Sequence, residues 1–153
     1  MFEECARKGS FSLSSGRKTD VFYDFDLLLP KEAAQYTEML LQSVPTDVKR
    51  KISFVASPSI GGIVPGFLTA FALNKPFVIV DADGNLRGPA FDQGSYLLVD
   101  DVATSFNEAN RVRKALSGKK CVGVACYIFR GSAVDLGKQD VPVFYLERKE
   151  EEV

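Results

Sequence analysis

Five apolar runs, separated by segments of helical periodicity, constrain the fold of this chain more than any other feature. The runs lie at residues 52–56, 76–80, 95–99, 121–129 and 141–146. Between them, helices are predicted from the glycines at 61–62 to about Leu73, at about 107–117 and, as a short turn, at 133–138. Strands buried on both faces have near-continuous apolar sequences, whereas half-exposed strands alternate. The order therefore predicts an α/β fold with a mostly parallel central sheet and helices on both faces.

The N-terminal part of the sequence does not follow this pattern. Residues 10–29 contain apolar stretches on either side of a turn at Gly16, which predicts two extended pieces. Pro30 begins a predicted helix that ends before Pro45, and its apolar face is formed by Ala33, Tyr36, Met39, Leu40 and Val44. Because 153 residues are too few for two ordinary domains, we expect one domain over 1–153, with an N-terminal segment (1–30) and a core (31–147).

The composition excludes several classes of function. The formal net charge is −1, so the chain lacks the positive field that holds nucleic acid. It contains no histidine, which excludes Ser-His-Asp and Cys-His catalysis and the usual zinc sites. Cys121 and Cys126 lie in an apolar run without C-x-x-C spacing and are predicted to be buried thiols. With no apolar stretch of the ~18 residues that a membrane span needs and no secretory signal, we expect a cytoplasmic protein.

Two adjacent carboxylates, Asp100 and Asp101, follow the third apolar run. Ligands of open α/β sheets bind at the carboxyl ends of the strands. A carboxylate pair there can accept hydrogen bonds from the two vicinal hydroxyls of a ribose, and the N–H groups of the next turn and helix can bind a phosphate. The alternative is a solvated Asp pair before a helix that is simply capped by Ser105 and Glu108.

Residues 99–105 (Val-Asp-Asp-Val-Ala-Thr-Ser) resemble the phosphoribosyl-pyrophosphate (PRPP) motif of type I phosphoribosyltransferases. Three further segments, 11–24, 57–66 and 73–80, are similar to the N-terminal signature, the pyrophosphate-side loop and the following segment of orotate phosphoribosyltransferases. Arg130, in Tyr-Ile-Phe-Arg-Gly, matches the position where that family places an arginine for the orotate ring. The resemblance runs from about residue 9 to residue 146, and the ordered set of motifs indicates the orotate branch.

The resemblance implies transfer of the 5-phosphoribosyl group from PRPP to a pyrimidine base, with release of pyrophosphate. It also implies a small N-terminal hood formed by residues 1–30, a homodimer, and Mg²⁺ bound through PRPP without direct protein ligands. The implied PRPP-binding residues are Ser59, Ile60, Gly61, Gly62, Asp100, Asp101, Thr104, Ser105, Phe106 and Asn107. Asp101 would also assist the oxocarbenium-like transition state.

The base would lie among Phe22, Tyr23 and Arg130, with Arg130 forming a charge-assisted bond to the acidic ring. Each assignment has a structural alternative. Phe22 and Tyr23 can be core residues, and the glycines at 61–62 can begin a tightly packed helix. Arg130 can form a surface ion pair with Asp135 or Glu147.

Three departures from the family pattern all reduce positive charge around the polyanion site. The segment at 81–90, where relatives carry a long basic loop, is short, with two acids and only Arg87. The phosphate turn reads Thr-Ser-Phe-Asn-Glu over 104–108 instead of Thr-Thr-Gly-Gly-Ser, and Ser14 stands where a lysine is common. Two functions follow: a transferase in which Arg87 or a partner's basic residue replaces the loop cations, or a catalytically impaired relative that serves as a nucleotide- or PRPP-binding or regulatory module.

Overall fold

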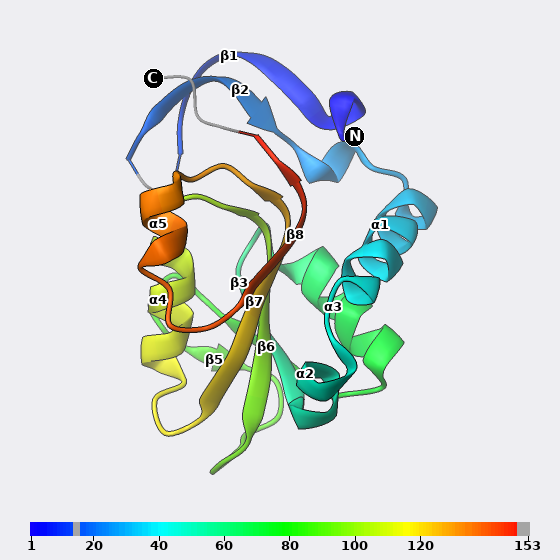
Figure 1. The fold of residues 1–153 in the computed structure, drawn as a ribbon, viewed down its shortest axis with the longest axis vertical. Coiled ribbons are helices and arrows are strands. Elements are labelled where there is room, and N and C mark those ends of the chain that lie inside the picture. The colour runs from blue at the N-terminus through cyan, green and yellow to red at the C-terminus, as the bar shows by residue number, and fades with distance from the viewer. Residues whose placement is uncertain (14–15, 150–153) are drawn as a thin grey trace.

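The computed structural model describes residues 1–13 and 16–149 and contains two sheets (Figure 1). Strands β1 (Ala6–Ser12) and β2 (Lys18–Tyr23) of the hood form an antiparallel pair, as the two extended pieces predicted. The hood lies across one end of the large sheet (Figure 1). The departure noted at Ser14 lies outside the described residues.

The large sheet has six strands in the order β5-β4-β3-β6-β7-β8, and all neighbouring strands are parallel except β4 and β5. Its strands are β3 (Phe54–Pro58), β4 (Phe77–Val80), β5 (Leu86–Arg87), β6 (Ser95–Ala103), β7 (Lys120–Phe129) and β8 (Val143–Arg148). This arrangement confirms the predicted mostly parallel sheet.

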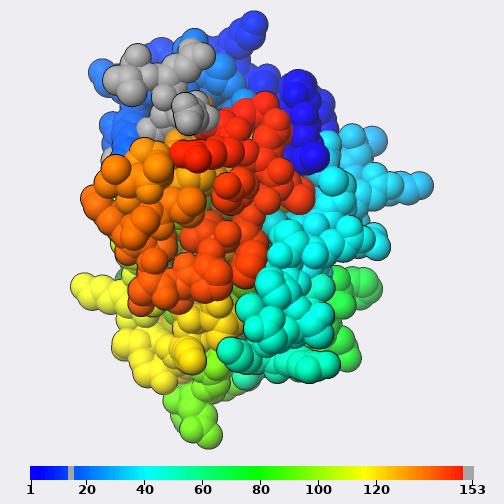
Figure 2. Space-filling view, in the orientation of Figure 1, coloured from blue at the N-terminus to red at the C-terminus, as the bar shows by residue number. Residues whose placement is uncertain are grey.

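Helices cover both faces of this sheet (Figure 1). One face carries α1 (Pro30–Gln42), α2 (Thr46–Lys51) and α3 (Ile63–Leu73), and the other carries α4 (Asn107–Ala115) and α5 (Ala133–Gly137). Two short 3₁₀ helices, η1 (Glu3–Cys5) and η2 (Phe25–Leu27), flank the hood strands. In the space-filling view, α1 in cyan and the stretch from α5 to the edge strand β8 in orange and red lie at the front of the molecule (Figure 2).

The core has one layer on each face of the sheet, and successive strand residues alternate between the layers. Phe54 and Leu98 belong to one layer, while Val55 and Leu97 belong to the other. All four side chains are fully buried, and each such burial contributes about 1.5–3 kcal/mol. Burial on both faces explains why the strand sequences are continuous apolar runs.

The expected face of α1 is wrong at one position. Met39 is 41% exposed, whereas Thr37 is buried. The Thr37 hydroxyl satisfies its hydrogen bonds by donating to the backbone carbonyl of Ala33 and by lying 2.7 Å from the hydroxyl of Tyr127. A buried, hydrogen-bonded threonine therefore lies on the face of α1 where the apolar pattern predicted Met39.

All three cysteines are buried free thiols, as expected for Cys121 and Cys126. None of the helices in the described ranges combines the length and apolar character that a membrane crossing requires.

Candidate active site

A cavity of about 260 Å³ lies between the hood and the carboxyl ends of β3 and β6. Its lining comes from four segments: the hood, the loop after β3, the end of β6 with the turn that follows, and the end of β7. The lining residues are Ser12, Leu13, Phe22, Tyr23, Pro58, Ser59, Gly61, Asp100, Asp101, Val102, Thr104, Glu108 and Arg130. The structure thus brings together the separate sequence motifs predicted to bind ligands. They meet at the edge where open α/β sheets bind ligands.

Asp100 and Asp101 place two carboxylates side by side in this cavity. Asp100 Oδ1 accepts from the backbone N–H of Asp101 at 2.8 Å, and Asp101 Oδ1 accepts from that of Val102 at 2.7 Å. Burial, followed by the neighbouring Asp101 charge, raises the pKa of Asp100 well above its usual range, and burial also raises the pKa of Asp101. Among the ion pairs of the described residues, none involves either carboxylate. The pair is therefore available for hydroxyl donors or for a cation that arrives with a ligand.

The loop after β3 comes close enough to Asp101 to require glycine. A Cβ atom on Gly61 would lie 2.5 Å from Asp101 Oδ2, and one on Gly62 would lie 2.8 Å from the carbonyl oxygen of Pro58. The close contact with the Asp101 carboxylate therefore requires glycine at position 61, whether or not helix packing also requires it. Ser59 lines the same cavity, whereas Ile60 is 82% exposed and lines an adjacent groove.

The turn after β6 differs from the expected capped helix start. The residue before α4 is Phe106, with φ of 67° and no side-chain cap, and Ser105 Oγ is buried without a hydrogen-bond partner. The expected Ser105–Glu108 capping box is therefore wrong. Phe106 turns inward and stacks on Phe129 with ring centroids 5.6 Å apart, so the core holds the side chain at the position where the family pattern has glycine.

Thr104 is buried and lines the main cavity, while Phe106 and Asn107 line a small hollow beside it. The Glu108 side chain reaches the main cavity and pairs with Arg111, with 2.6 Å between Oε2 and Nη2. Sequence reasoning missed Arg111, although its position three residues after Glu108 is the spacing of a helical ion pair.

Arg130 lies at the end of β7 and is buried, so the predicted alternative of a surface ion pair is wrong. Its Nη1 donates to the carbonyl of Val21 at 2.7 Å and its Nη2 to Thr19 Oγ1 at 2.9 Å, while Nε has no partner. The guanidinium also lies 5.2 Å from the centroid of the Tyr23 ring. Phe22 is 36% exposed and, like Tyr23, lines the cavity, so these aromatic side chains are not ordinary core residues.

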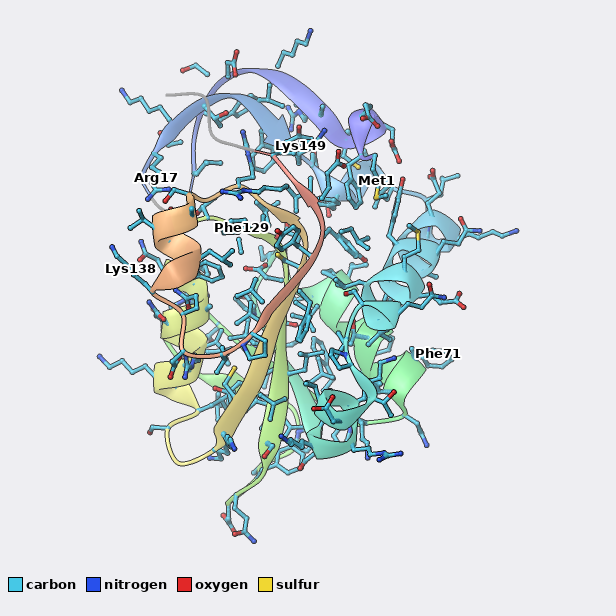
Figure 3. All side chains as sticks on the ribbon, viewed as in Figure 1. Met1, Arg17, Phe71, Phe129, Lys138 and Lys149 are labelled. Atoms are coloured by element: carbon cyan, nitrogen blue, oxygen red, sulfur yellow. The ribbon has the colours of Figure 1, made fainter. Side chains whose placement is uncertain are left out.

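The two carboxylates predicted as alternative partners of Arg130 form other ion pairs. Asp135 receives two bonds from Arg17, at 2.9 and 3.0 Å, and Glu147 pairs with Lys149. Arg17 lies beside α5 at the edge of the hood (Figure 3). Together with Arg130 it joins the hood to the core.

Arg87 lies on β5 at the edge of the large sheet and is not among the residues that line the cavity. The structure therefore does not bring this expected catalytic cation to Asp101. The lining also includes Ser12, Leu13, Pro58 and Val102, which the sequence analysis did not single out although they lie within or beside its motifs.

The fold is that of phosphoribosyltransferases of known structure. No established family model matches the sequence. Among solved structures, orotate phosphoribosyltransferase from Aeropyrum pernix has a TM-score of 0.79 at 23% identity, covering 94% of this chain and 88% of that one. Adenine phosphoribosyltransferase from Thermoanaerobacter pseudethanolicus has a TM-score of 0.74 at 16% identity, covering 97% and 98%.

Comparison with sequence relatives identifies the family to which the chain belongs. The orotate phosphoribosyltransferase of Caulobacter vibrioides is 31% identical over 148 residues, covering 90% of this chain and 73% of the relative. That of a Methylobacterium species is 35% identical over 141 residues, covering 85% and 71%. The chain belongs to the orotate phosphoribosyltransferase family, which confirms the resemblance found in its motifs.

Proposed function

We propose that this protein transfers the 5-phosphoribosyl group of PRPP to a pyrimidine base and releases pyrophosphate. The observation that carries the proposal is the carboxylate pair of buried Asp100 and half-buried Asp101, which forms no ion pair with the described residues and lies against the glycine loop after β3. The relatives are transferases by name, which favours this activity over a catalytically impaired binding module. Their name also points to orotate as the base.

In this account, Asp100 and Asp101 accept hydrogen bonds from the 2- and 3-hydroxyls of the ribose. The positive charge that develops on the ribose ring in an oxocarbenium-like transition state is stabilised by the nearby Asp101 carboxylate. The N–H groups of residues 104–107 bind the 5-phosphate at the start of α4. Phe22 and Tyr23 hold the ring of the base, and Arg130 stands at its acidic edge.

The site also fits a magnesium ion that is bound mainly by the substrate. Mg²⁺ prefers oxygen ligands and in phosphate-transfer sites is often held by one or two carboxylates together with substrate oxygens. In this account the oxygens of PRPP would hold the ion without direct protein ligands, because Asp100 and Asp101 accept hydrogen bonds from the ribose hydroxyls. When bound, the ion would offset the charge of the departing pyrophosphate.

A homodimer is part of the proposal, and the outer face of α3 supports it. An apolar stripe runs from Ile60, just before α3, along the helix through Val64, Phe67 and Phe71, and these side chains are 54–82% exposed. Phe71 projects away from the body (Figure 3). α3 carries no charged residue. With about 200 Å² for a large apolar side chain, the exposed surface of these four residues amounts to roughly 550 Å². Each partner of a standard interface buries about 800 Å².

The charges at the two ends of this stripe favour a second copy as the occupant. Asp26 lines the groove beside Val64, and Lys75 lies at the other end beside Phe71. A two-fold axis that sets two α3 helices antiparallel brings the Asp26 end of one copy against the Lys75 end of the other. Such a copy would also lie next to the cavity, because Gly61 and Asp101 line both the site and the groove that reaches Val64.

Sedimentation tests this interface directly. Phe71→Glu is expected to give monomers, whereas Val134→Glu, at a 65% exposed position on α5, should remain dimeric. Asp26→Lys should weaken the dimer, and Lys75→Glu added to it should restore the dimer. Wild-type monomers, or equal behaviour of the Phe71 and Val134 variants, would refute the interface.

Calorimetry tests the ligand assignment. We expect PRPP with Mg²⁺ to bind first and orotate to bind the PRPP complex more tightly than the free protein, because the base site adjoins the ribose site. Failure to bind either ligand would refute the proposed function. A cytoplasmic location completes the proposal and is supported by three cysteines that are all free thiols.

A further inference from the structure

Glu108 brings a third carboxylate to a cavity that is proposed to bind a polyanion. It lines the cavity with Asp100 and Thr104, at the first turn of α4 where the 5-phosphate would lie. An anion bound at a helix N-terminus is stabilised by the helix dipole, and an uncompensated carboxylate at the same place opposes it. If the turn is to accept phosphate, the charge of Glu108 has to be offset by a cation.

Arg111 is placed to offset it. Its Nη2 donates to Glu108 Oε2 at 2.6 Å. Its Nη1 donates to the backbone carbonyl of Val80 at 3.3 Å and to that of Asp81. The Arg111 side chain is only 22% exposed. The guanidinium is therefore held on the end of β4, and it fixes the Glu108 side chain from that side.

This arrangement differs from an ordinary ion pair on a helix surface. Exposed pairs contribute little because both side chains move freely in solvent. Arg113, on the same helix, pairs at 2.7 Å with Asp140, whose side chain is 73% exposed, and neither residue lines the cavity. Arg111 instead joins the phosphate turn to residue 81, where the short segment that replaces the basic loop of relatives begins.

We propose that Arg111 is a positioning residue of the phosphate turn, whose ion pair with Glu108 offsets the carboxylate charge so that the turn can accept the 5-phosphate of PRPP. The inference rests on the proposed function, because it assumes that PRPP is the ligand. It also explains how a chain with Glu108 at this turn retains a phosphate site without the glycines of its relatives. The role depends on the carboxylate: without Glu108, Arg111 has no charge to offset.

A double-mutant cycle on PRPP affinity tests this dependence. Arg111→Met should weaken PRPP binding about tenfold, because it leaves the Glu108 charge uncompensated beside a phosphate. Glu108→Gln should bind PRPP at least as tightly as the wild type. In the Glu108→Gln background, Arg111→Met should change the affinity by less than about twofold. Equal losses in both backgrounds, or no loss in either, would overturn the inference.

Matched variants separate this role from a loss of structure. Arg113→Met removes the other ion pair of α4 and should leave PRPP affinity unchanged. Arg111→Lys keeps the charge and should retain most of the affinity even if Arg111→Met lowers the melting temperature. A tenfold loss in Arg113→Met or Arg111→Lys would indicate a structural effect and would contradict the proposal.

A second probe separates this inference from the proposed function. Inorganic phosphate requires only the turn, so the same cycle is measured with phosphate in place of PRPP. If the cycle appears with phosphate while PRPP does not bind, the proposed function fails and the role of Arg111 stands. If the wild type binds neither probe, the turn does not accept phosphate and the role of Arg111 is refuted.

Discussion

Arg130 donates a hydrogen bond from Nη1 to the backbone carbonyl of Val21 at 2.7 Å, which ties the end of β7 to the hood. Its second bond, to Thr19, reaches the same hood strand, β2, that carries Phe22 and Tyr23. The residue proposed to bind the base therefore also positions the aromatic residues around the base. The proposed base site therefore requires that the hood be held on the core.

Arg130→Ala is expected to weaken orotate binding by more than about tenfold and PRPP binding much less, because the ribose carboxylates are on β6. Faster hydrogen exchange in β2 should accompany the change, since two bonds to that strand are lost. Calorimetry and exchange mass spectrometry measure the two effects. The control is Arg7→Ala, which removes an exposed pair with Asp24 elsewhere in the hood. Equal losses for both ligands would contradict the base-binding role.

Gly61→Ala is expected to weaken PRPP binding about tenfold or more with little effect on the melting temperature. The added Cβ would lie 2.5 Å from the Asp101 carboxylate and would displace it from its position. Gly137→Ala on α5 is the control, because a Cβ there has no neighbour within 4 Å. Unchanged PRPP affinity in Gly61→Ala would show that the position of Asp101 does not matter for binding.

Asp100→Asn is expected to stabilise the free protein at pH 7 by on the order of 1 kcal/mol while weakening PRPP binding. The pKa of Asp100 is raised in the fold, so keeping it charged at neutral pH costs folding free energy. That cost falls as the pH decreases and the carboxyl becomes protonated in the folded state. The stability gain of the variant should therefore shrink between pH 7 and pH 4 in urea unfolding experiments. A loss of stability at pH 7 would be inconsistent with this account.

Asp135→Asn should show the opposite dependence and serves as the comparison. The Arg17 guanidinium and the Ser132 backbone N–H hold the pKa of Asp135 far below its usual range. Its ionised form therefore stabilises the fold at neutral pH, and this contribution is lost as the pH falls below about 4. The variant should be less stable than the wild type at pH 7, with the difference disappearing in acid. A difference that grows in acid would rule out this assignment.

Phe106→Gly is expected to destabilise the protein by about 2–3 kcal/mol. Glycine relieves the cost of the left-handed backbone, about 1–2 kcal/mol, but loss of a buried phenylalanine costs about 3–5 kcal/mol. Phe106 has the left-handed backbone, with φ of 67°, and its buried ring stacks on Phe129, so both effects apply to this residue. Denaturant unfolding measures the balance. A variant at least as stable as the wild type would show that the ring contributes little to the core.

The sheet could be predicted because each of its long strands is encoded by a continuous apolar run of residues. Strands β3, β6 and β7 are mostly buried, and β4 and β8 pack apolar side chains against the core, so each leaves an apolar run. α2 and β5 lack this signal: the α2 sequence Thr-Asp-Val-Lys-Arg-Lys has no apolar face, and the Leu86–Arg87 strand is two exposed residues at an edge. Their conformation depends on neighbours that the sequence pattern does not reveal.

Motif order also located most of the cavity lining, since Asp100, Gly61 and Tyr23 each lie in a recognisable segment. Side-chain contacts between residues of different segments could not be predicted from the order of the motifs. Ser105 and Glu108 have the spacing of a capping box, yet Phe106 enters the core and turns the backbone away, while Arg111 binds Glu108. The bonds of Arg130 to the hood join residues about a hundred positions apart, and no local pattern encodes them.

The most direct test of the central claim is the rate of nucleotide formation from PRPP, Mg²⁺ and orotate, compared between the wild type and Asp100→Asn/Asp101→Asn. The account predicts that the wild type forms nucleotide and pyrophosphate in equal amounts. In the double variant kcat/KM should fall at least about a hundredfold, because the ribose hydroxyls and the developing positive charge lose both carboxylates. Absence of nucleotide with the wild-type protein, or an unchanged rate in the double variant, would contradict the assignment of this cavity as the active site.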